Sequence, residues 1–403
     1  MDGLDDQVYC LAEYNGELYV GGRFSMAGGN AAMRIAKWND IEWSTFGANV
    51  YGNVDDLIVY QGELYAAGDF YHIGTETVGG IGRWNGVSWS AVGNQPFSGG
   101  ATCFAIYNDE LYVGGFWGLL KWDGSDWSSV GSGFNGLVNA LTVHNGELYA
   151  VGDFFSPYVG IAKYDGTIWS AVGNSGSGGG VEGFPKAVAS YNGNLYVGGL
   201  LFYVDGMAVE GIAKWDGVSW SSVGGGLNND VEAFLVADGK LYAAGFFTRA
   251  GENEEVVLPH VGAWDDSSWL RIQPVSGLNS WAFALAMYNG CLYAGGNFNG
   301  YGFGTSLFHQ IAKYCAWVGI TEDPLDGSCT VYPNPSDGHF QIRMSEYQPY
   351  LRVEIYSLLG ETIHEEETSG AEISLRLRDI PSGTYFVKVG TGEVSFCQKL
   401  LIQ

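Results

Sequence analysis

Apolar and small residues form a short segment that recurs seven times in the first three quarters of the chain. Its first copy is Glu17-Leu18-Tyr19-Val20-Gly21-Gly22, and the Leu-Tyr pair returns at Leu64, Leu111, Leu148, Leu195, Leu241 and Leu292. Successive copies are 46, 47, 37, 47, 46 and 51 residues apart. A repeat of this length predicts a propeller or another repeat array.

Each repeat contains four strand-like pieces, which are clearest in the fifth copy at residues 188–191, 194–199, 211–215 and 220–223. The dipeptides Asn192-Gly193 and Asp216-Gly217 separate the first two and the last two pieces. Asn-Gly and Asp-Gly favour positive φ at both central residues of a type I′ hairpin turn. The pattern therefore predicts an antiparallel, all-β unit of four strands.

Two aromatic residues five positions apart flank the second turn in six of the repeats. We expect these large flat rings to fill the space between neighbouring units, with carbohydrate stacking as the alternative role. The pairs are Trp38/Trp43, Trp84/Trp89, Trp122/Trp127, Tyr164/Trp169, Trp215/Trp220 and Trp264/Trp269. Glycine pairs such as Gly21-Gly22 and Gly295-Gly296 are expected to allow close backbone approach.

The repeat resembles the kelch-type unit, which has an apolar strand ending in Gly-Gly and then Tyr or Trp, Asp or Asn, and Trp. The resemblance covers residues 1–320 and implies a seven-bladed β-propeller. The last repeat departs from the pattern, because Tyr314 and Trp317 are only three positions apart. Since propellers normally close by sharing one blade between the chain ends, we expect either a short strand near Trp317 or a segment upstream of Met1 to complete it.

The tight turns should lie on one face of such a propeller, which leaves the longer and more variable loops on the other. Loops on a rigid scaffold commonly carry function, and aromatic rings beside carboxylates and amides suit a glycan or protein ligand. The alternative is that these are ordinary loop residues. The predicted binding residues are Tyr71, His72, Tyr158, Tyr203, Asp205, Arg249, Tyr301 and His309.

Catalytic and metal-binding motifs are not found. Kelch relatives include galactose-oxidase-like copper enzymes, but His72, His144, His260 and His309 lack the spacing of metal ligands. Cys10 and Cys103 occupy a repeat position held elsewhere by alanine, which predicts small buried thiols. We therefore expect no catalytic residue, no metal and no cofactor, with Ca²⁺ binding left open. An extracellular hydrolase or copper oxidase with its site on the long-loop face is the competing hypothesis.

The charge of the chain limits its partners. Its 403 residues include 18 Lys and Arg against 44 Asp and Glu, a formal net charge of −26. Nucleic acids and anionic membranes attract clustered positive charge, so neither is an expected partner. No apolar run is long enough for a membrane helix, and the acidic start has no signal peptide, which suggests a truncated N-terminus. We expect a monomer.

Cys291 and Cys315 stand at the facing ends of the second and third predicted strands of the last repeat. Such ends lie side by side in an antiparallel pair, so a Cys291–Cys315 disulfide is predicted. The alternative is two unrelated thiols. A disulfide would place the protein in an oxidising compartment.

The composition changes after the repeats. An acidic linker at residues 321–328 precedes residues 329–403, where short alternating strands predict a small Ig-like β-sandwich. This segment is similar to the type A C-terminal sorting domain of type IX secretion cargo in Bacteroidetes. The matching motifs contain Tyr332, Pro333, Asn334, Pro335, Gly338, Gly360, Gly383, Tyr385 and Lys399.

The resemblance implies export by the type IX secretion machinery, followed by release or attachment at the cell surface. Together with the repeats, it predicts a secreted or outer-membrane surface protein that binds an extracellular glycan or protein. A structural or adhesive spacer is a third possibility.

Overall fold

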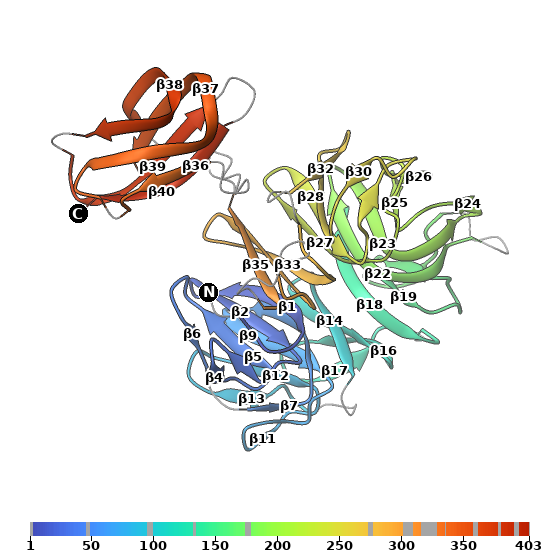
Figure 1. Ribbon diagram of the computed structural model, residues 1–403. Helices are drawn as coiled ribbons and strands as arrows, with labels where there is room; N and C mark the ends of the chain where they lie inside the picture. Colours follow the sequence, from blue (N-terminus) through green and yellow to red (C-terminus); the bar gives the residue numbers. More distant parts are fainter. Residues whose placement is uncertain are drawn as a thin grey trace. The chain divides into compact units, whose positions relative to one another are not determined.

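The computed structural model describes residues 3–45, 49–94, 100–131, 134–173, 179–272, 277–300, 309–315, 329–334, 336–357, 362–377, 380–390 and 395–402. These residues form strands and turns and contain no helix, hence none that could cross a membrane. The chain forms two compact units, of which the first ends at Tyr314 and the second begins at Cys315. Figure 1 shows both units along the chain.

The described residues of the first unit form seven consecutive sheets, here called sheets 1 to 7. Sheet 1 contains β1 (Val8–Tyr14), β2 (Glu17–Gly22), β5 (Ile35–Trp38) and β6 (Trp43–Ser44). Sheet 2 contains β8 (Val54–Tyr60), β9 (Glu63–Gly68), β12 (Ile81–Trp84) and β13 (Trp89–Ala91). Sheet 3 contains β14 (Ala101–Tyr107), β15 (Glu110–Gly115), β16 (Gly118–Trp122) and β17 (Trp127–Ser129).

The next four sheets repeat this order. Sheet 4 contains β18 (Leu137–His144), β19 (Glu147–Asp153), β20 (Ile161–Tyr164) and β21 (Trp169–Ser170). Sheet 5 contains β22 (Val181–Tyr191), β23 (Asn194–Val204), β25 (Ile212–Trp215) and β26 (Trp220–Ser222), and β24 (Met207–Ala208) also pairs with β23. Sheet 6 contains β27 (Val231–Ala237), β28 (Lys240–Gly245), β31 (Val261–Trp264) and β32 (Trp269–Arg271). Sheet 7 contains β33 (Ala282–Tyr288), β34 (Cys291–Gly296) and β35 (Ile311–Cys315).

Loops between the second and third strands, predicted to be longer and more variable than the turns, fold back as small hairpins in several sheets. They are β3 (Met26–Ala27) with β4 (Asn30–Ala31), β10 (His72–Ile73) with β11 (Glu76–Thr77), and β29 (Arg249–Ala250) with β30 (Val256–Val257). β10 also pairs with β7 (Val50–Tyr51). Backbone pairing therefore gives these loops regular structure of their own.

The two kinds of turn in each repeat differ. At the first turn both residues have positive φ, as at Asn15 (52°) and Gly16 (74°), which is the predicted type I′ geometry. The second turn was predicted in the same form, and this is wrong. Trp84 lies directly opposite Trp89, which leaves four residues between them, and Asn85 Oδ1 accepts the backbone N–H groups of Val87 and Ser88. The side chain therefore forms an Asx turn.

The aromatic pairs that flank this turn are in contact with each other and with the preceding sheet. Their ring centroids are 5.1–5.6 Å apart, as in Trp38–Trp43 at 5.2 Å. Trp127, Trp169 and Trp269 donate their indole N–H groups to backbone carbonyls of the preceding sheet's final loop. The rings fill the space between sheets, as expected.

The first strands contact one another in the order β1, β8, β14, β18, β22, β27, β33 and then β1 again. A tyrosine on the first strand of one sheet donates to a turn of the next, as from Tyr14 to the Gly62 carbonyl at 3.1 Å. Tyr288 of sheet 7 repeats this contact with the Gly16 carbonyl of sheet 1 at 3.0 Å. The contacts therefore run around a ring whose two ends meet.

We expected one sheet to be shared between the chain ends, but the described strands do not show this. Sheet 1 is built from residues 8–44 and sheet 7 from residues 282–315, and Trp317 lies outside the described residues. Side chains join the two sheets instead, since Asp40 accepts from Tyr293 at 2.7 Å and pairs with Lys313. Burial opposes ionisation, but hydrogen bonds from Lys313, Tyr293 and Asn289 lower the pKa of Asp40 to about 2.

Residue sizes are matched where neighbouring sheets touch. A Cβ added to Gly21 would lie 2.6 Å from Val54 Cγ1 of sheet 2, and one added to Gly295 would overlap Val8 Cγ1 of sheet 1. Where the repeat has Ala67 instead, its partner in the same cluster is the smaller Ala101. The glycines thus allow the close backbone approach that was predicted.

The described part of the second unit forms five strands around one core. They are β36 (Cys329–Tyr332), β37 (His339–Ser357), β38 (Thr362–Arg376), β39 (Gly383–Gly390) and β40 (Ser395–Ile402), in the order β36-β37-β39-β40 with β38 against β37. Alternate residues of the long β37, including Phe340, Ile342, Val353 and Ile355, are buried in this core. Period-two burial explains the alternating sequence.

Candidate functional site

A β-bulge occurs at the same position in the first strand of every repeat sheet. In sheet 1 the register skips from Val8 to Cys10, which leaves Tyr9 outside the ladder. Such bulges redirect a side chain and often occur next to functional sites. The seven bulged residues are all half-buried, and we call them the axial ring: Tyr9, Asp55, Thr102, Asn139, Lys186, Glu232 and Phe283.

One part of the axial ring is charged. Lys186 Nζ lies 3.4 Å from Glu232 Oε1, so the pair joins sheets 5 and 6. Asn139 donates to Asp153 Oδ1 at 3.2 Å and to the Pro185 carbonyl at 2.9 Å. Burial raises the pKa of Asp153 and of Glu232, and the Lys186 charge partly offsets both shifts.

The neighbouring part of the ring is aromatic. Tyr9 and Phe283 have ring centroids 5.9 Å apart, and Phe283 lies 6.0 Å from Phe246. Phe246 stacks on Trp281 at 4.4 Å with an angle of 29° between the ring planes, and Trp281 is 40% exposed. Sheets 1, 6 and 7 therefore hold a half-buried aromatic cluster, with Trp281 exposed, beside the charged residues.

Asp230 has unmet hydrogen-bonding capacity at this site. Its Oδ1 atom is buried and accepts no hydrogen bond from the described residues. Burial raises the pKa of this carboxyl, and the positive charge of Lys186 opposes the shift. An unpaired buried acceptor is costly, so a bound donor at this point would be favoured.

Asp55 has a strongly shifted acidity. Burial is the main cause and the negative charges of Asp69 and Asp56 add to it, raising the pKa of Asp55 to about 7. Burial likewise raises the pKa of Asp56 to about 7, although Asp56 accepts the backbone N–H of Phe104 at 2.7 Å. Two adjacent carboxyls of sheet 2 therefore take up protons near neutral pH.

The Asp55→Asn variant is expected to flatten the pH dependence of stability. The unfolded-state pKa is about 3.9, so between about pH 4 and 7 the folded state holds a proton that the unfolded state has lost. The unfolding free energy contributed by Asp55 therefore falls as pH rises through this window. Denaturant midpoints measured from pH 4 to 8 should decline less steeply in the variant, with part of the slope left by Asp56. An unchanged slope would contradict this account.

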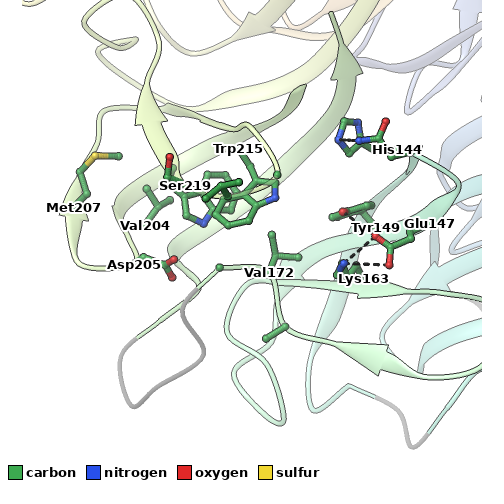
Figure 2. A pocket seen from close by; sticks show the side chains of 16 residues that line it. His144, Glu147, Tyr149, Lys163, Val172, Val204, Asp205, Met207, Trp215 and Ser219 are labelled. Atoms are coloured by element: carbon green, nitrogen blue, oxygen red, sulfur yellow. Dashed lines mark hydrogen bonds and ion pairs between the residues drawn. The ribbon is translucent and has the colours of Figure 1, made fainter. Parts of the chain in front are cut away.

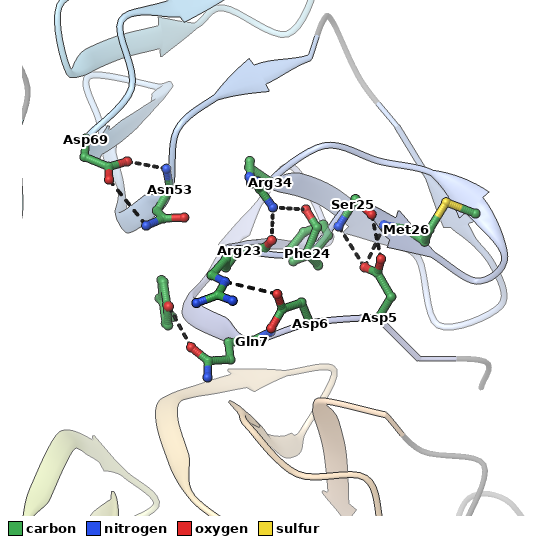
Figure 3. A network of polar contacts seen from close by, with 11 residues as sticks. Asp5, Asp6, Gln7, Arg23, Phe24, Ser25, Met26, Arg34, Asn53 and Asp69 are labelled. Atoms are coloured by element: carbon green, nitrogen blue, oxygen red, sulfur yellow. Dashed lines mark hydrogen bonds and ion pairs between the residues drawn. The ribbon is translucent and has the colours of Figure 1, made fainter.

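Side chains near the N-terminus fix the edge of the site in sheet 1 (Figure 3). Asp5 accepts the backbone N–H groups of Ser25 and Met26 at 2.7 and 2.8 Å, and Asp6 pairs with Arg23 at 3.1 Å. Asn228 has the same role as Asp5 in sheet 6, where it caps Thr248 and Arg249. These polar side chains therefore form hydrogen bonds that stabilise the loops.

The described members of the predicted loop set are spread over sheets 2, 4, 5, 6 and 7. No hydrogen bond or ion pair joins any two of them in the parts of the chain that the structure describes. Tyr71 is 47% exposed, His72 is exposed in β10, Tyr203 is 45% exposed and His309 is exposed with its carbonyl bonded to Leu4. Tyr301 lies outside the described residues.

Several of these residues have structural contacts, among them His72, whose Nδ1 lies 3.3 Å from Thr77 Oγ1. Tyr158 donates to the Trp169 carbonyl at 2.7 Å, and Arg249 donates to the Glu254 carbonyl at 3.0 Å within its own hairpin. Asp205 and Gly206 have φ values of 47° and 79°, which makes them the turn between β23 and β24. This Asp-Gly pair carried the same signal as the turns that were recognised.

The axial ring was missed, although a sequence signal exists. Its members all stand nine residues before the Leu of the repeated Leu-Tyr pair. The next position holds the buried thiols of Cys10 and Cys103, whose pKa values are raised by burial, but it also holds Asp56. When the repeats are compared, one position holds varied and mostly polar residues, and the next position holds mostly small ones. This pattern indicates that the side chains at the first position point out of the core.

Metal ligands are not grouped in the parts of the chain that the structure describes. No three His, Cys, Asp or Glu side chains lie close enough together to hold an ion there.

The sorting motifs meet in the second unit. Asn334 Oδ1 accepts the Leu401 N–H at 2.9 Å, and Ser336 N–H donates to the Leu401 carbonyl. Gly338 has a φ of 92°, and Tyr385 is buried and donates to the Pro381 carbonyl. Tyr332 ends β36 and Pro333 follows it, Gly383 begins β39, and Lys399 is in β40. Pro335 and Gly360 lie outside the described residues.

Residues 330–403 match the family described as a secretion system C-terminal sorting domain. This domain indicates export to the cell surface or secretion, and interaction with the type IX secretion machinery.

The chain is similar to several solved structures. The extracellular domain of a Bacteroides thetaiotaomicron protein, described as a hybrid two-component system, is similar with a TM-score of 0.53 and 12% identity. The match covers 99% of this chain and 56% of that one, so the chain spans about half of that structure's length. PorZ, described as a surface component of the Porphyromonas gingivalis type IX secretion system, has a TM-score of 0.36 and 15% identity over 98% of this chain and 66% of its own. No curated protein matches the sequence.

Proposed function

We propose that the chain is an exported binding protein whose axial ring holds an extracellular glycan or protein segment. The observation that carries the proposal is the joining of Lys186, several half-buried carboxyls and an aromatic cluster with the exposed Trp281 around seven equivalent bulges. Stacking rings beside hydrogen-bonding groups suit sugar rings and aromatic or basic side chains. The excess of carboxylates disfavours anionic ligands.

The Lys186→Met variant tests this site. Wild-type protein should bind members of a glycan array or a peptide array, and the variant should bind the same members at least about tenfold more weakly, as expected for a central interface residue. Lys240→Met removes the same charge at the start of β28 and should bind like the wild type. Failure of the wild type to bind either array, or equal binding by Lys186→Met, would refute the proposal.

A hydrolase is the second candidate because Asp55 has the acidity of a general acid and lies beside the carboxylate of Asp69. In that case the bound glycan would be cut, and Asp55→Asn would still bind it without cutting. Chromatography of the array ligands after incubation separates the two functions. If the ligands remain intact, the hydrolase hypothesis is rejected and the binding function is retained.

We infer that the seven repeat sheets are the blades of a kelch-type propeller and that the second unit is an Ig-like β-sandwich. The ring of first-strand contacts and the repeated tyrosine hydrogen bonds support the first inference. Residues from both halves of β37 are buried in one core, and this supports the inference that the second unit is a sandwich. An experimental structure in which sheets 1 and 7 are not neighbours would overturn the propeller.

We also propose a Cys291–Cys315 disulfide. The side chain of Cys315 lies outside the described residues, but the register of the other sheets supports the pairing. In sheet 1 Leu18 faces Trp38, and in sheet 6 Leu241 faces Trp264. The same register places Leu292 opposite Tyr314 and Cys291 opposite Cys315. Mass mapping should find both residues protected from alkylation until a reductant is added; alkylation without reductant would disprove the bond.

A further inference from the structure

A cavity of about 710 Å³ lies between sheets 4 and 5, and no residue of the axial ring lines it. Figure 2 shows the residues around it. Ligand pockets commonly have volumes of about 300–1,000 Å³. Trp215 lies on one side of this cavity, and Glu147, Tyr149 and Lys163 lie on the other. We call it the wedge pocket.

The wedge pocket exposes an aromatic face that the other repeats bury. Trp215 is half-buried, whereas its counterparts Trp38, Trp84, Trp122, Tyr164 and Trp264 are buried. In several neighbouring pairs of sheets, a first-strand tyrosine packs beside this aromatic residue, as Tyr107 does with Tyr164 at 6.4 Å. Sheet 4 has His144 in that position, and its imidazole bonds Ser190 Oγ at 2.8 Å. The phenol ring that would cover Trp215 is therefore replaced by a smaller imidazole.

The wedge pocket also contains an unpaired donor. Trp127, Trp169 and Trp269 donate their indole N–H groups to the carbonyls of Val92, Val130 and Val223. The corresponding contact in sheet 5 would join Trp220 to Val172. Among the described residues, however, the buried Trp220 Nε1 has no hydrogen-bond partner, and Trp220 is only 8% exposed. Such a group favours a ligand that brings an acceptor.

The remaining groups point to the chemistry of that ligand. Lys163 and Glu147 form an ion pair at 2.9 Å, so neither offers an uncompensated charge, and Asp205 adds a carboxylate. An anion would meet these carboxylates, and a purely apolar ligand would leave Trp220 N–H unpaired. A ring with C–H groups on one face and hydroxyls at its edge satisfies Trp215, Trp220 and the ion pair together.

We propose that the wedge pocket binds a neutral saccharide, stacked on Trp215 and hydrogen-bonded to Trp220, Lys163 and Glu147. The proposal concerns a second site and does not depend on the axial ring. It also explains why the first-strand tyrosine is replaced in sheet 4.

The decisive variant is His144→Tyr, which restores the residue found in most other repeats. The new phenol should reach the Gly193 carbonyl, as Tyr191 reaches Gly239, and should cover Trp215 without unfolding the protein. Neutral mono- and oligosaccharides would be titrated up to about 10 mM, a range that detects dissociation constants of about 1 mM, with saturation-transfer NMR and tryptophan fluorescence as readouts.

We expect wild-type binding, at least about tenfold weaker binding by His144→Tyr, and unchanged binding by Trp264→Phe, a control at the buried counterpart in sheet 6. Lys186→Met should also bind normally, which separates this site from the axial ring. The proposal is overturned if no neutral saccharide binds the wild type, if His144→Tyr binds as well as the wild type, or if only a peptide occupies the pocket.

Discussion

Removal of residues 329–403 is expected to leave the protein in the periplasm when it is produced behind a signal peptide in a type IX secreting host. The removed segment is the sorting domain that indicates export. The repeat sheets belong to the other compact unit, so the truncated protein should still fold. Surface labelling of intact cells and fractionation with an antibody to the repeats would measure the distribution.

A smaller deletion tests the same point without removing the whole unit. Loss of residues 400–403 takes away Leu401, which anchors the turn that contains Asn334 and Ser336. This variant should also fail to reach the surface, whereas Lys186→Met should be exported normally. Normal surface levels of either truncated protein would show that the segment is not the export signal.

The Gly295→Ala variant is expected to destabilise the first unit strongly. Its new methyl group would overlap Val8 Cγ1 and lie 3.0 Å from Val8 Cβ, at the contact between sheets 7 and 1. Overpacking of this kind costs about 1–3 kcal/mol. Adding Val8→Ala should recover much of the loss, because Ala67 with Ala101 already forms such a pair. Denaturant unfolding followed by tryptophan fluorescence would give both values.

A mismatched pair controls for general effects. A Cβ added to Gly198 would meet Val231 Cγ1 at 2.7 Å, so Gly198→Ala should be destabilising but should not be rescued by Val8→Ala. Equal rescue of both glycine variants, or a Gly295→Ala protein as stable as the wild type, would mean that sheets 7 and 1 are not packed together.

The repeat architecture could be predicted from sequence because its signals are local. The Leu-Tyr spacing, the Asn-Gly turns and the paired tryptophans each reflect one hairpin, and each hairpin forms, although the second has a longer turn than expected. The second turn was misjudged because Asn85 was interpreted as a backbone turn residue, while its effect comes from the side-chain oxygen. Backbone preference and side-chain capping give the same Asn-Gly signature.

The candidate site could not be predicted in this way because it is assembled from seven distant segments. Lys186 and Glu232 are 46 positions apart and meet only when sheets 5 and 6 are neighbours. The length of the loops led to the prediction of Tyr71 and Arg249 as binding residues. These loops fold into hairpins, and some of their polar groups, such as the Arg249 guanidinium, form hydrogen bonds within the hairpin. The wedge pocket could not be predicted for a similar reason. His144 replaces a tyrosine whose ring would cover Trp215, and this matters only when sheets 4 and 5 are neighbours.

The most direct test of the central claim is a hydrogen–deuterium exchange map of the wild type with and without the array ligand it binds best. Bulged residues leave the strand ladder, so their amides should exchange measurably. A ligand at the axial ring should protect peptides that contain Tyr9, Asp55, Lys186, Glu232 and Phe283, although these belong to five different sheets. Protection confined to the hairpins around His72 and Arg249, or to one sheet alone, would contradict the account.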